Sequence, residues 1–412
     1  MASFHVIGAG LAGLAAALVL SETNDPVTVY EAGPVAGGRC RSYFDRELGL
    51  TIDNGNHLLL SGNRAAFSYL RTIGSVDKLN GPATARFPFM DLSTDQRWTV
   101  QPNAGPLPWW ILLPARRVPD TRLVDYLGLL SLAHRKDEAT VAAALRHSRL
   151  YWRLVEPLAV AALNTRPDEA LARLLGAVVR ETLMRGGSAA IPYFPRAGLA
   201  GALIEPALQR LRERGVAVQL GRRITALSIA DGRIAMLETG QGAVPLGPED
   251  GVVLAVPPWA AATLVPGLVV PDAFQAILNI HFPLDSTSGT EGFLGLIGGT
   301  AEWVFVKAGH VSVTISAANH MVDQSAEAIA ARVWPDVCRA LGINAKMPPY
   351  RVVKERRATF AATAAQEIRR PGPKTWLSNL VLAGDWTDTG LPATIEGAVR
   401  SGQMAAGILN AS

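Results

Sequence analysis

Short apolar runs alternate with longer helical patterns at the start of this chain of 412 residues. An apolar run at residues 4–7 precedes a stretch at 11–20 with apolar residues at helical spacing, and a second apolar run follows at 27–30. Runs of this length predict buried strands, and the spacing between them predicts a helix. The beginning of the chain is therefore expected to form a strand, a tight turn, a helix and a second strand, as in an α/β fold with a parallel sheet.

A second group of elements is predicted in the middle of the chain. Residues 198–215 have the pattern of an amphipathic helix. Alternating strands follow around Asp231-Gly232, a pair of residues that favours a hairpin turn. Residues 250–258 contain a buried strand that two prolines end.

The glycine-rich start could also be a signal peptide or a membrane anchor. Residues 1–3 carry no basic side chain, however, and glycines interrupt the apolar run where an export helix should be continuous. The run from Val6 to Leu20 has 15 residues, whereas a membrane span needs roughly 20. Both alternatives therefore fit poorly.

Three glycines follow the first strand in the spacing G-x-G-x-x-G, as Gly8, Gly10 and Gly13. In dinucleotide-binding folds the first glycine makes the turn, the second lets the backbone approach a pyrophosphate, and the third lets the helix pack on the strand. Glu31 ends the second strand 18 residues beyond Gly13, where an acid can accept hydrogen bonds from ribose hydroxyls. The motif alone is weak, but the motif in this context predicts dinucleotide binding.

Two further segments extend this site. Gly37 and Gly38 precede Arg39, and a guanidinium group beside a flexible glycine pair can bind a phosphate oxygen; the alternative is an ordinary loop with a solvated arginine. Near the other end, an apolar strand at 380–383 leads through Gly384-Asp385 and a loop to a helix that opens near Thr394. The start of a helix can stabilise negative charge, such as that on a reduced flavin.

Composition and charge exclude several other classes of function. The 39 basic and 35 acidic residues are spread along the chain, so nucleic-acid binding is unsupported. The two cysteines, Cys40 and Cys338, make neither a disulfide framework nor a metal cluster, and the seven histidines show no ligand spacing. No metal site is therefore predicted, and a reducing cytoplasm is expected.

Apolar segments between these motifs point to a greasy ligand or surface. Residues 106–117 place Trp109 and Trp110 between prolines, ahead of two arginines, a composition suited to a membrane interface. The alternative is a loop buried on the core. Residues 126–135 and 141–164 have helical patterns and could either roof an apolar tunnel or form ordinary core helices.

The motifs at both ends, with "GGR" and "AGDWT…EGAVRSG", resemble those of the FAD-dependent amine oxidase and carotenoid desaturase superfamily. Four further segments narrow the resemblance to the squalene-associated FAD-dependent desaturases, understood as hydroxysqualene dehydroxylases of bacterial hopanoid biosynthesis. They are "TIDNGNHLLLSGN", "VEPLAVAALNT", "ILNIHFPLD" and "RRATFAAT". The resemblance runs nearly end to end. The flavin motifs are highly specific, and the substrate motifs are less so.

This resemblance implies a mixed α/β fold. A Rossmann-like FAD-binding domain would be built from three separated segments, with an inserted substrate domain of β-sheet and helices. The expected FAD-binding domain comprises residues 1–80, 196–264 and 356–412, and the expected substrate domain comprises 81–195 and 265–355. The residues expected to bind FAD, from the motifs and the resemblance together, are Gly8, Gly10, Leu11, Ala12, Gly13, Glu31, Ala32, Gly37, Gly38, Arg39, Asn54, Gly55, Ile224, Gly384, Asp385, Thr394 and Ile395.

The resemblance also implies the reaction, in which the hydroxyl group of an allylic triterpene alcohol is replaced by hydrogen. Reduced FAD would deliver hydride to carbon as the C–O bond breaks, so the site needs a group that assists the departing oxygen and a dry pocket. The candidate catalytic residues are His57, a possible proton donor or a structural turn residue, and Asp53, a fixed anion or a structural cap. His281 lies in an apolar strand and is expected to be a satisfied residue of the site wall rather than a catalyst. Glu396 could equally have a structural or a catalytic role.

Two other functions are compatible with these motifs. One is another flavoenzyme, a carotenoid-type desaturase or an amine oxidase. The other is a non-enzymatic isoprenoid carrier, although intact motifs at both ends of the cofactor argue against it. The expected partners are a hydrophobic triterpene alcohol, a membrane surface and an unidentified electron donor, with the protein cytoplasmic and peripheral on the inner face of the cell membrane.

Overall fold

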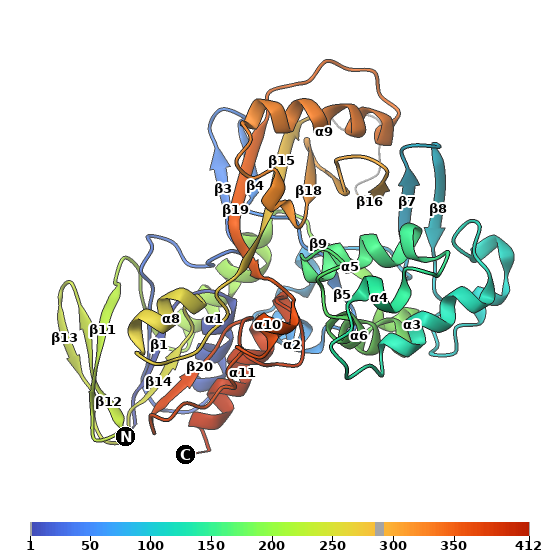
Figure 1. Cartoon of the computed structure of the whole chain (residues 1–412). Coiled ribbons are helices and arrows are strands. Elements are labelled where there is room, and N and C mark those ends of the chain that lie inside the picture. The colour runs from blue at the N-terminus through green and yellow to red at the C-terminus, as the bar shows by residue number, and fades with distance from the viewer. Residues whose placement is uncertain (1, 285–291, 412) are drawn as a thin grey trace.

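The computed structural model describes residues 2–284 and 292–411, and it contains a parallel sheet and a larger mixed sheet (Figure 1). Five strands from distant parts of the chain form the parallel sheet. In spatial order they are β10 (Ala217–Gln219), β2 (Val27–Tyr30), β1 (Phe4–Ile7), β14 (Gly251–Leu254) and β20 (Leu380–Leu382). The side chains of β1, β14 and β20 are buried on both faces, which explains why these three strands read as continuous apolar runs.

Helices α1 (Leu11–Leu20) and α11 (Ile395–Leu409) pack together beside this sheet, with α7 (Glu205–Glu213) next to α1. A Cβ on Gly402 of α11 would lie 2.1 Å from the carbonyl oxygen of Ala12. The two helices can therefore approach this closely only because α11 carries a glycine there. Their contact joins the two ends of the chain, as Figure 1 shows.

The predicted hairpin at Asp231-Gly232 is confirmed. Both residues have positive φ angles, of 51° and 72°, as a two-residue hairpin turn of type I′ requires. The hairpin belongs to a three-stranded antiparallel sheet beside the parallel one. Its strands are β11 (Ile224–Ala230), β12 (Arg233–Thr239) and β13 (Gly242–Pro245).

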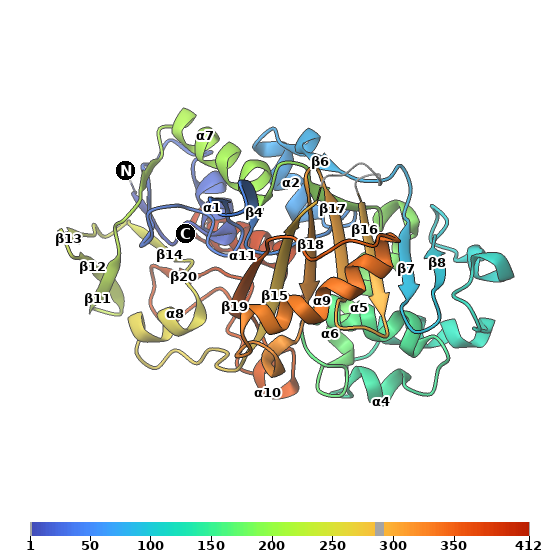
Figure 2. The same ribbon diagram turned by 90° about the horizontal axis from the view of Figure 1, so that it is seen from above.

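The larger sheet has seven strands, and all pair antiparallel except β16 with β7. In spatial order they are β19 (Arg351–Phe360), β15 (Phe274–Pro283), β18 (His310–Ile315), β17 (Trp303–Lys307), β16 (Gly292–Ile297), β7 (Phe87–Asp91) and β8 (Gln96–Val100). Helix α9 (Ala326–Leu341) covers one face, where Leu278, Val304 and Val313 form a core with it (Figure 2). The fold is thus the mixed α/β arrangement that was expected.

Helices from the middle of the chain cover the other side of this sheet, where Trp303 and Phe305 enter their core. They are α3 (Leu127–Leu132), α4 (Val141–Leu145), the π-helical turn η5 (Tyr151–Val155), α5 (Glu156–Leu163) and α6 (Ala172–Glu181). Residues 126–135 and 141–164 therefore contain helices with a buried face, as the pattern predicts.

Shorter elements connect these parts. They are β3 (Ser42–Asp45), β4 (Leu50–Asp53), β5 (Leu59–Leu60), α2 (Arg64–Thr72), β6 (Leu79–Asn80), β9 (Pro192–Pro195), α8 (Pro258–Leu264) and α10 (Ala364–Glu367). The expected division into domains stays a prediction, but its boundary between residues 355 and 356 falls inside β19, which pairs with β15 on both sides of that point. Within the described residues, no helix is long and apolar enough to cross a bilayer.

Candidate functional site

The glycine loop after β1 has room for a ligand at one position only. Gly8 has a φ of +108°, and a Cβ there would lie 2.5 Å from the carbonyl oxygen of Ala255. A Cβ on Gly13 would lie 1.9 Å from the carbonyl oxygen of Gly8, so α1 needs a glycine to pack on the loop. A Cβ on Gly10, in contrast, would have no heavy atom within 4 Å. The first and third glycines are packing positions, and the second leaves space beside the start of α1 for a phosphate group.

Glu31 borders this loop directly after β2. Its Oε2 accepts a hydrogen bond of 2.9 Å from the backbone N–H of Ala9, and its Oε1 accepts one of 2.7 Å from Gly33. Carboxylate oxygens accept more than one hydrogen bond each, so capacity is left for a ribose hydroxyl. Ile224 begins β11 and is buried in the same core as Tyr30. The contacts of Glu31 and Ile224 with a nucleotide stay predictions.

The fold brings the two halves of the predicted cofactor site together. Arg39 donates through a terminal nitrogen to Oδ1 of Asp385 at 2.6 Å, and it also donates to the carbonyl oxygen of Ala358. Arg39 is therefore not the free, solvated side chain of the alternative interpretation. Gly38, with a φ of +54°, lies next to Gly10, since its Cβ would be 3.5 Å from the Cα of Gly10.

The C-terminal helix begins as the sequence predicts. Thr394 is the N-cap of α11, and its hydroxyl accepts a hydrogen bond of 3.0 Å from the backbone N–H of Gly397. Ile395 is the first residue of the helix. Gly384 has a φ of +151° and donates from its backbone N–H to the hydroxyl of Ser401, which fastens the preceding loop to α11.

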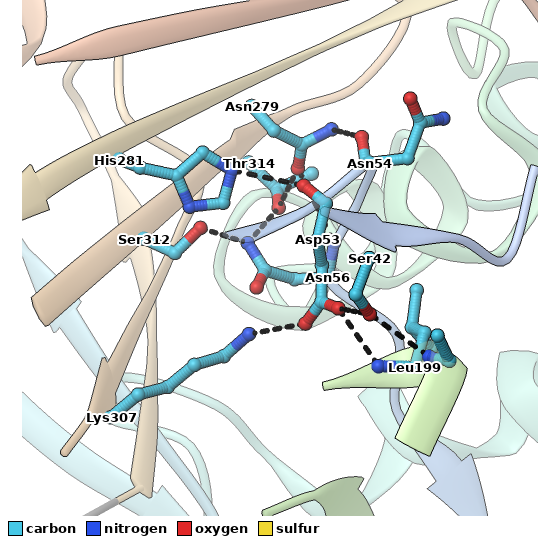
Figure 3. A network of polar contacts seen from close by, with 11 residues as sticks. Ser42, Asp53, Asn54, Asn56, Leu199, Asn279, His281, Lys307, Ser312 and Thr314 are labelled. Atoms are coloured by element: carbon cyan, nitrogen blue, oxygen red, sulfur yellow. Dashed lines mark hydrogen bonds and ion pairs between the residues drawn. The ribbon is translucent and has the colours of Figure 1, made fainter. Parts of the chain in front are cut away.

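A polar turn, residues 54–57, lies between β4 and β5 and is docked on the larger sheet (Figure 3). The amide nitrogen of Asn279 donates to the carbonyl oxygen of Asn54 at 3.1 Å. The amide nitrogen of Asn56 donates to the hydroxyls of Ser312 at 2.7 Å and Thr314 at 3.1 Å. These bonds hold the turn against β15 and β18 and give it a defined shape.

Asp53 is the buried anion at the start of this turn. Lys307 of β17 donates to its Oδ2 at 2.9 Å, while Ser42 and the backbone N–H of Leu199 donate to its Oδ1 at 2.6 and 2.8 Å. Burial raises the pKa of Asp53, but Lys307 and these hydrogen bonds outweigh it and hold that pKa below its usual value. Of the two expectations for Asp53, the fixed anion and the structural cap, the geometry supports both, because both of its oxygens accept hydrogen bonds from other segments.

His57 is the polar side chain of the turn that stays available. It is half-buried, and within residues 2–284 and 292–411 it makes no hydrogen bond. Burial lowers the pKa of His57 to about 4, with Arg39 and Lys307 acting in the same direction and Asp53 opposing them. At neutral pH the imidazole is therefore uncharged, so it can offer one N–H donor and one acceptor but not the proton of an imidazolium ion.

His281 and Glu396 are occupied by structural contacts. The Nε2 atom of His281 lies 3.1 Å from the carbonyl oxygen of Asp53, and burial lowers the pKa of His281 to about 3. The two carboxylate oxygens of Glu396 accept hydrogen bonds of 3.0 and 2.9 Å from the backbone N–H groups of Ala65 and Ala66, at the start of α2. These contacts favour structural roles for His281, as expected, and for Glu396, and both roles stay predictions.

Several residues of this network escape sequence reasoning. Lys307 is the clearest of them, because it ends the apolar run "WVFVK" of β17 and is nearly buried. A lysine in such a run needs a buried partner of opposite charge. Its presence in the sequence could therefore have indicated a buried ion pair. Asn279, in "ILNIHF" of β15, gave a similar one. The position of Leu199 gave none, since it is 146 residues from Asp53 in the sequence, and Ser42 meets Asp53 only through the pairing of β3 with β4.

The residues present fit FAD. An open position at Gly10, an acid at Glu31 and an arginine-carboxylate pair at Arg39 lie along one path from the start of α1 to the loop before α11. Taken in the order Glu31, Gly10 and the Arg39–Asp385 pair, these groups would meet the adenosine ribose, the phosphates and the flavin end of a dinucleotide in turn. Direct contacts of the remaining predicted residues, Leu11, Ala12, Ala32, Asn54 and Gly55 among them, stay predictions.

Comparison with known proteins agrees with this geometry. Residues 11–285 and 307–410 match the family of flavin containing amine oxidoreductases. The chain is 51% identical over 410 residues to hydroxysqualene dehydroxylase of Rhodopseudomonas palustris, which covers 99% of this chain and 98% of that protein. It is 50% identical over 403 residues to the enzyme of the same name from Sinorhizobium fredii, which covers 98% of this chain and 97% of that one.

A solved structure shares the fold at low sequence identity. Cyclohexylamine oxidase from Brevibacterium oxydans superposes with a TM-score of 0.71 at 16% identity, covering 99% of this chain and 98% of that one. The family match and the close relatives together assign the chain. It belongs to the hydroxysqualene dehydroxylase family within the flavin containing amine oxidoreductases, and it is an FAD-dependent oxidoreductase.

Proposed function

We propose that this enzyme converts hydroxysqualene to squalene, as one step of hopanoid or triterpene biosynthesis. The observation that carries the proposal is the nearly end-to-end similarity to hydroxysqualene dehydroxylases, which extends through the large sheet and its helices as well as the cofactor motifs. Reduced FAD supplies a hydride equivalent in this reaction. The hydride replaces the hydroxyl group at an allylic carbon, and the oxygen leaves as water after it gains a proton.

This reaction needs a group that assists the departing oxygen and a pocket that excludes water, and residues of the chain could meet both needs. The uncharged imidazole of His57, held on a rigid turn, can donate an N–H hydrogen bond to the departing oxygen. The sheet face below the helices carries Phe293, Trp303 and Phe305 within one aromatic and aliphatic core. We infer that the substrate site borders this apolar core, which would keep out water that could otherwise trap an allylic cation.

Anaerobic turnover of hydroxysqualene by pre-reduced protein tests this function. We expect one equivalent of squalene for each reduced flavin, together with the return of the oxidised flavin spectrum. An amine oxidase would instead be reduced by amines and reoxidised rapidly by oxygen, and a desaturase would oxidise a polyene. A protein that purifies without flavin and only binds isoprenoids would be a carrier. Any of these three results would overturn the assignment.

We also propose that the enzyme docks on the inner face of the cell membrane, where a triterpene substrate is dissolved, and that a separate electron donor reduces its flavin. Exposed apolar side chains gather between residues 107 and 130, at the end of the molecule beside α3 (Figure 1). Eight of the 21 large exposed hydrophobic residues in the described part of the chain fall in this stretch, namely Leu107, Trp109, Leu112, Leu113, Leu123, Val124, Leu127 and Leu130. We call this surface the 107–130 patch, and clustering of this kind marks an interaction site.

Buried contacts beneath the 107–130 patch hold its loop in place. Trp110 is buried and meets Tyr126 edge to face, with ring centroids 5.5 Å apart. The side chain of Asn103 donates to the carbonyl oxygens of Gly105 and Leu107, both at 2.9 Å, and accepts from the backbone N–H of Trp110. The loop therefore presents its apolar residues outward in a defined shape. Of the two adjacent tryptophans, only Trp109 faces solvent.

Basic side chains accompany the patch. The guanidinium of Arg116 lies 5.3 Å from the ring centroid of Trp109, and Arg117 and Arg122 are close by in the sequence. Arginines next to exposed tryptophan and leucine favour an anionic lipid surface, because the rings enter the interface while the charges meet head groups. The patch is accordingly wider than residues 106–117 and includes η4 (Leu123–Tyr126) and α3.

Replacing Trp109 and Leu112 by serine should weaken binding to anionic liposomes at least tenfold, since two exposed apolar anchors are lost, each worth about 1 kcal/mol or more. Sedimentation of the protein with liposomes measures this, and the flavin spectrum should be unchanged. Trp376→Ser is the matched control, because Trp376 is 58% exposed but lies outside the patch. Equal binding by the double variant and the control would exclude the patch as the docking surface.

A further inference from the structure

A hollow on the protein surface reaches the arginine-carboxylate pair of the cofactor site. Arg39 and Asp385 line it, and its other walls come mainly from residues within 257–274 and 357–360. Its volume is about 230 Å³, and Trp259 in its wall is 38% exposed. The hollow therefore connects solvent with the end of the site where the flavin is expected.

A bulge in β19 directs Arg357 toward this hollow. At residues 356–358, three residues of β19 lie opposite Ala276 of β15 alone, and bulges of this kind re-aim side chains. The guanidinium of Arg357 lies 4.7 Å from the ring centroid of Trp259 and 5.7 Å from that of Phe274. An arginine thus covers an exposed tryptophan at the mouth of the hollow.

A second hollow adjoins the first and is lined by residues of 267–269 and 368–376. Arg370 lines it, and the guanidinium of Arg370 lies 4.9 Å from the ring centroid of Phe360, which lines the first hollow. Helices α8 and α10 belong to the same segments, and both views show them away from the 107–130 patch (Figures 1 and 2). We call the two hollows and the exposed side chains around them the 257–376 surface; these side chains are Trp259, Val269, Arg357, Ile368, Lys374 and Trp376.

Positive charge predominates on the 257–376 surface. Its two segments, 257–274 and 357–376, carry four basic and two acidic side chains, namely Arg357, Arg369, Arg370, Lys374, Asp272 and Glu367. Asp272 pairs with Arg369 at 2.8 Å. Glu367 pairs with Arg370 at 2.9 Å. In the described part of the chain, Arg357 and Lys374 have no acidic partner. Unpaired charges of one sign attract a partner of the opposite sign, so this surface suits an acidic molecule.

A carrier protein fits the 257–376 surface better than a nicotinamide dinucleotide does. The hollow beside Arg39 has a volume of about 230 Å³, whereas sites that enclose small ligands have roughly 300–1,000 Å³. The G-x-G-x-x-G pattern that binds dinucleotide phosphates occurs once in the chain, at residues 8–13, and is assigned to FAD. Tryptophan and arginine, in contrast, often anchor protein interfaces, and electron-transfer contacts can be small.

We propose that the 257–376 surface docks an acidic one-electron carrier protein, which reduces the flavin. Two carrier molecules are oxidised in turn by one electron each, and both electrons pass to oxidised flavin, which takes up one proton from solvent. The proposal rests on the separate electron donor proposed above and not on the identity of the substrate. The first hollow brings the carrier to the flavin end of the site, and the unpaired cations orient it there.

Reversal of the two unpaired charges tests the proposal. Flavin-loaded enzyme without substrate is mixed anaerobically with a pre-reduced two-iron ferredoxin of acidic surface, and loss of the oxidised flavin spectrum gives the second-order rate constant. Arg357→Glu combined with Lys374→Glu should lower this constant at least tenfold at low ionic strength, because like charges oppose the encounter. The difference should shrink as salt screens the charges. Reduction by dithionite, which needs no docking, should be unchanged.

Arg332→Glu combined with Lys346→Glu is the matched control, because both residues are exposed on or after α9 and the net charge changes by the same amount. This control should be reduced by ferredoxin at a rate close to that of the unaltered protein. Ile368→Ser keeps every charge and changes a side chain that is 77% exposed. It should slow reduction at high salt as well, since salt does not screen an apolar contact.

Three results would overturn the proposal. They are equal rates for the two charge-reversed proteins, faster reduction of the flavin by NADPH than by ferredoxin, and loss of liposome binding in place of loss of ferredoxin reduction. Since no substrate is present, none of them depends on hydroxysqualene, and failure of the proposed function would appear separately in the anaerobic turnover described above.

Discussion

Gly10→Val should give a folded protein that purifies without flavin. A Cβ at Gly10 meets no heavy atom within 4 Å, and its φ of −76° is accessible to any residue, so valine fits the free chain without strain. The two methyl groups would instead occupy the space beside the start of α1 where the pyrophosphate must lie. We expect flavin affinity to fall by at least 100-fold, measured as bound flavin per protein and as binding of added FAD.

A matched control distinguishes this effect from a general disturbance of the fold. Gly407→Val changes a glycine near the end of α11 that is likewise open, with nothing within 4 Å of its Cβ position. That variant should keep its flavin. Gly13→Val, in contrast, should fail to fold, because its Cβ would lie 1.9 Å from the Gly8 oxygen. Full flavin occupancy in Gly10→Val would show that the phosphates bind elsewhere.

His57→Ala should slow the reaction of the reduced enzyme with hydroxysqualene by about 100-fold while leaving flavin bound. Hydrogen-bond donors aimed at departing charge contribute factors of this size. Since burial lowers the pKa of His57 to about 4, the imidazole is already neutral above about pH 5, and the rate that depends on it should be flat between pH 6 and 8. The measurement is anaerobic reoxidation of flavin per bound FAD in a single turnover.

A structural role for His57 predicts a different pattern. The variant would then lose flavin or stability, and the remaining loaded enzyme would react at nearly the normal rate. His320→Ala is the control, because His320 is exposed and far from the turn in the sequence. A decrease of less than about fivefold, well below the range for a catalytic hydrogen bond, would remove His57 from the mechanism.

The backbone around the glycine loop and the start of α11 was largely predictable from the sequence, because its geometry is set by neighbouring residues. Only glycine tolerates the positive φ at Gly8 and the close approach at Gly13, so these residues, between an apolar run and a helical pattern, predict a strand, a turn and a helix. The same reasoning holds for Thr394, whose hydroxyl caps a helix three residues later. Motifs of this kind therefore predict a ligand class before the fold is known, when the elements around them agree.

Other features depended on tertiary contacts, which the sequence pattern does not reveal. Trp109 and Trp110 are adjacent and chemically alike, yet one is half exposed and the other buried, because Asn103 and Tyr126 fasten the loop in one orientation. The boundary expected between residues 355 and 356 falls within β19, and the sequence did not indicate the extent of this strand for a related reason. The length of β19 is set by its pairing with β15. Local composition does not show where pairing between distant strands begins or ends.

The sequence by itself determined the parallel sheet, the glycine loop, the Asp231-Gly232 hairpin and the family, because backbone sterics and apolar periodicity act over a few residues. Only the tertiary structure decided the charge state of the polar turn. Asp53 meets Lys307 across 254 positions of sequence, and burial of the turn keeps His57 neutral. Burial and pairing set the protonation of a side chain, and both arise only when distant segments pack together.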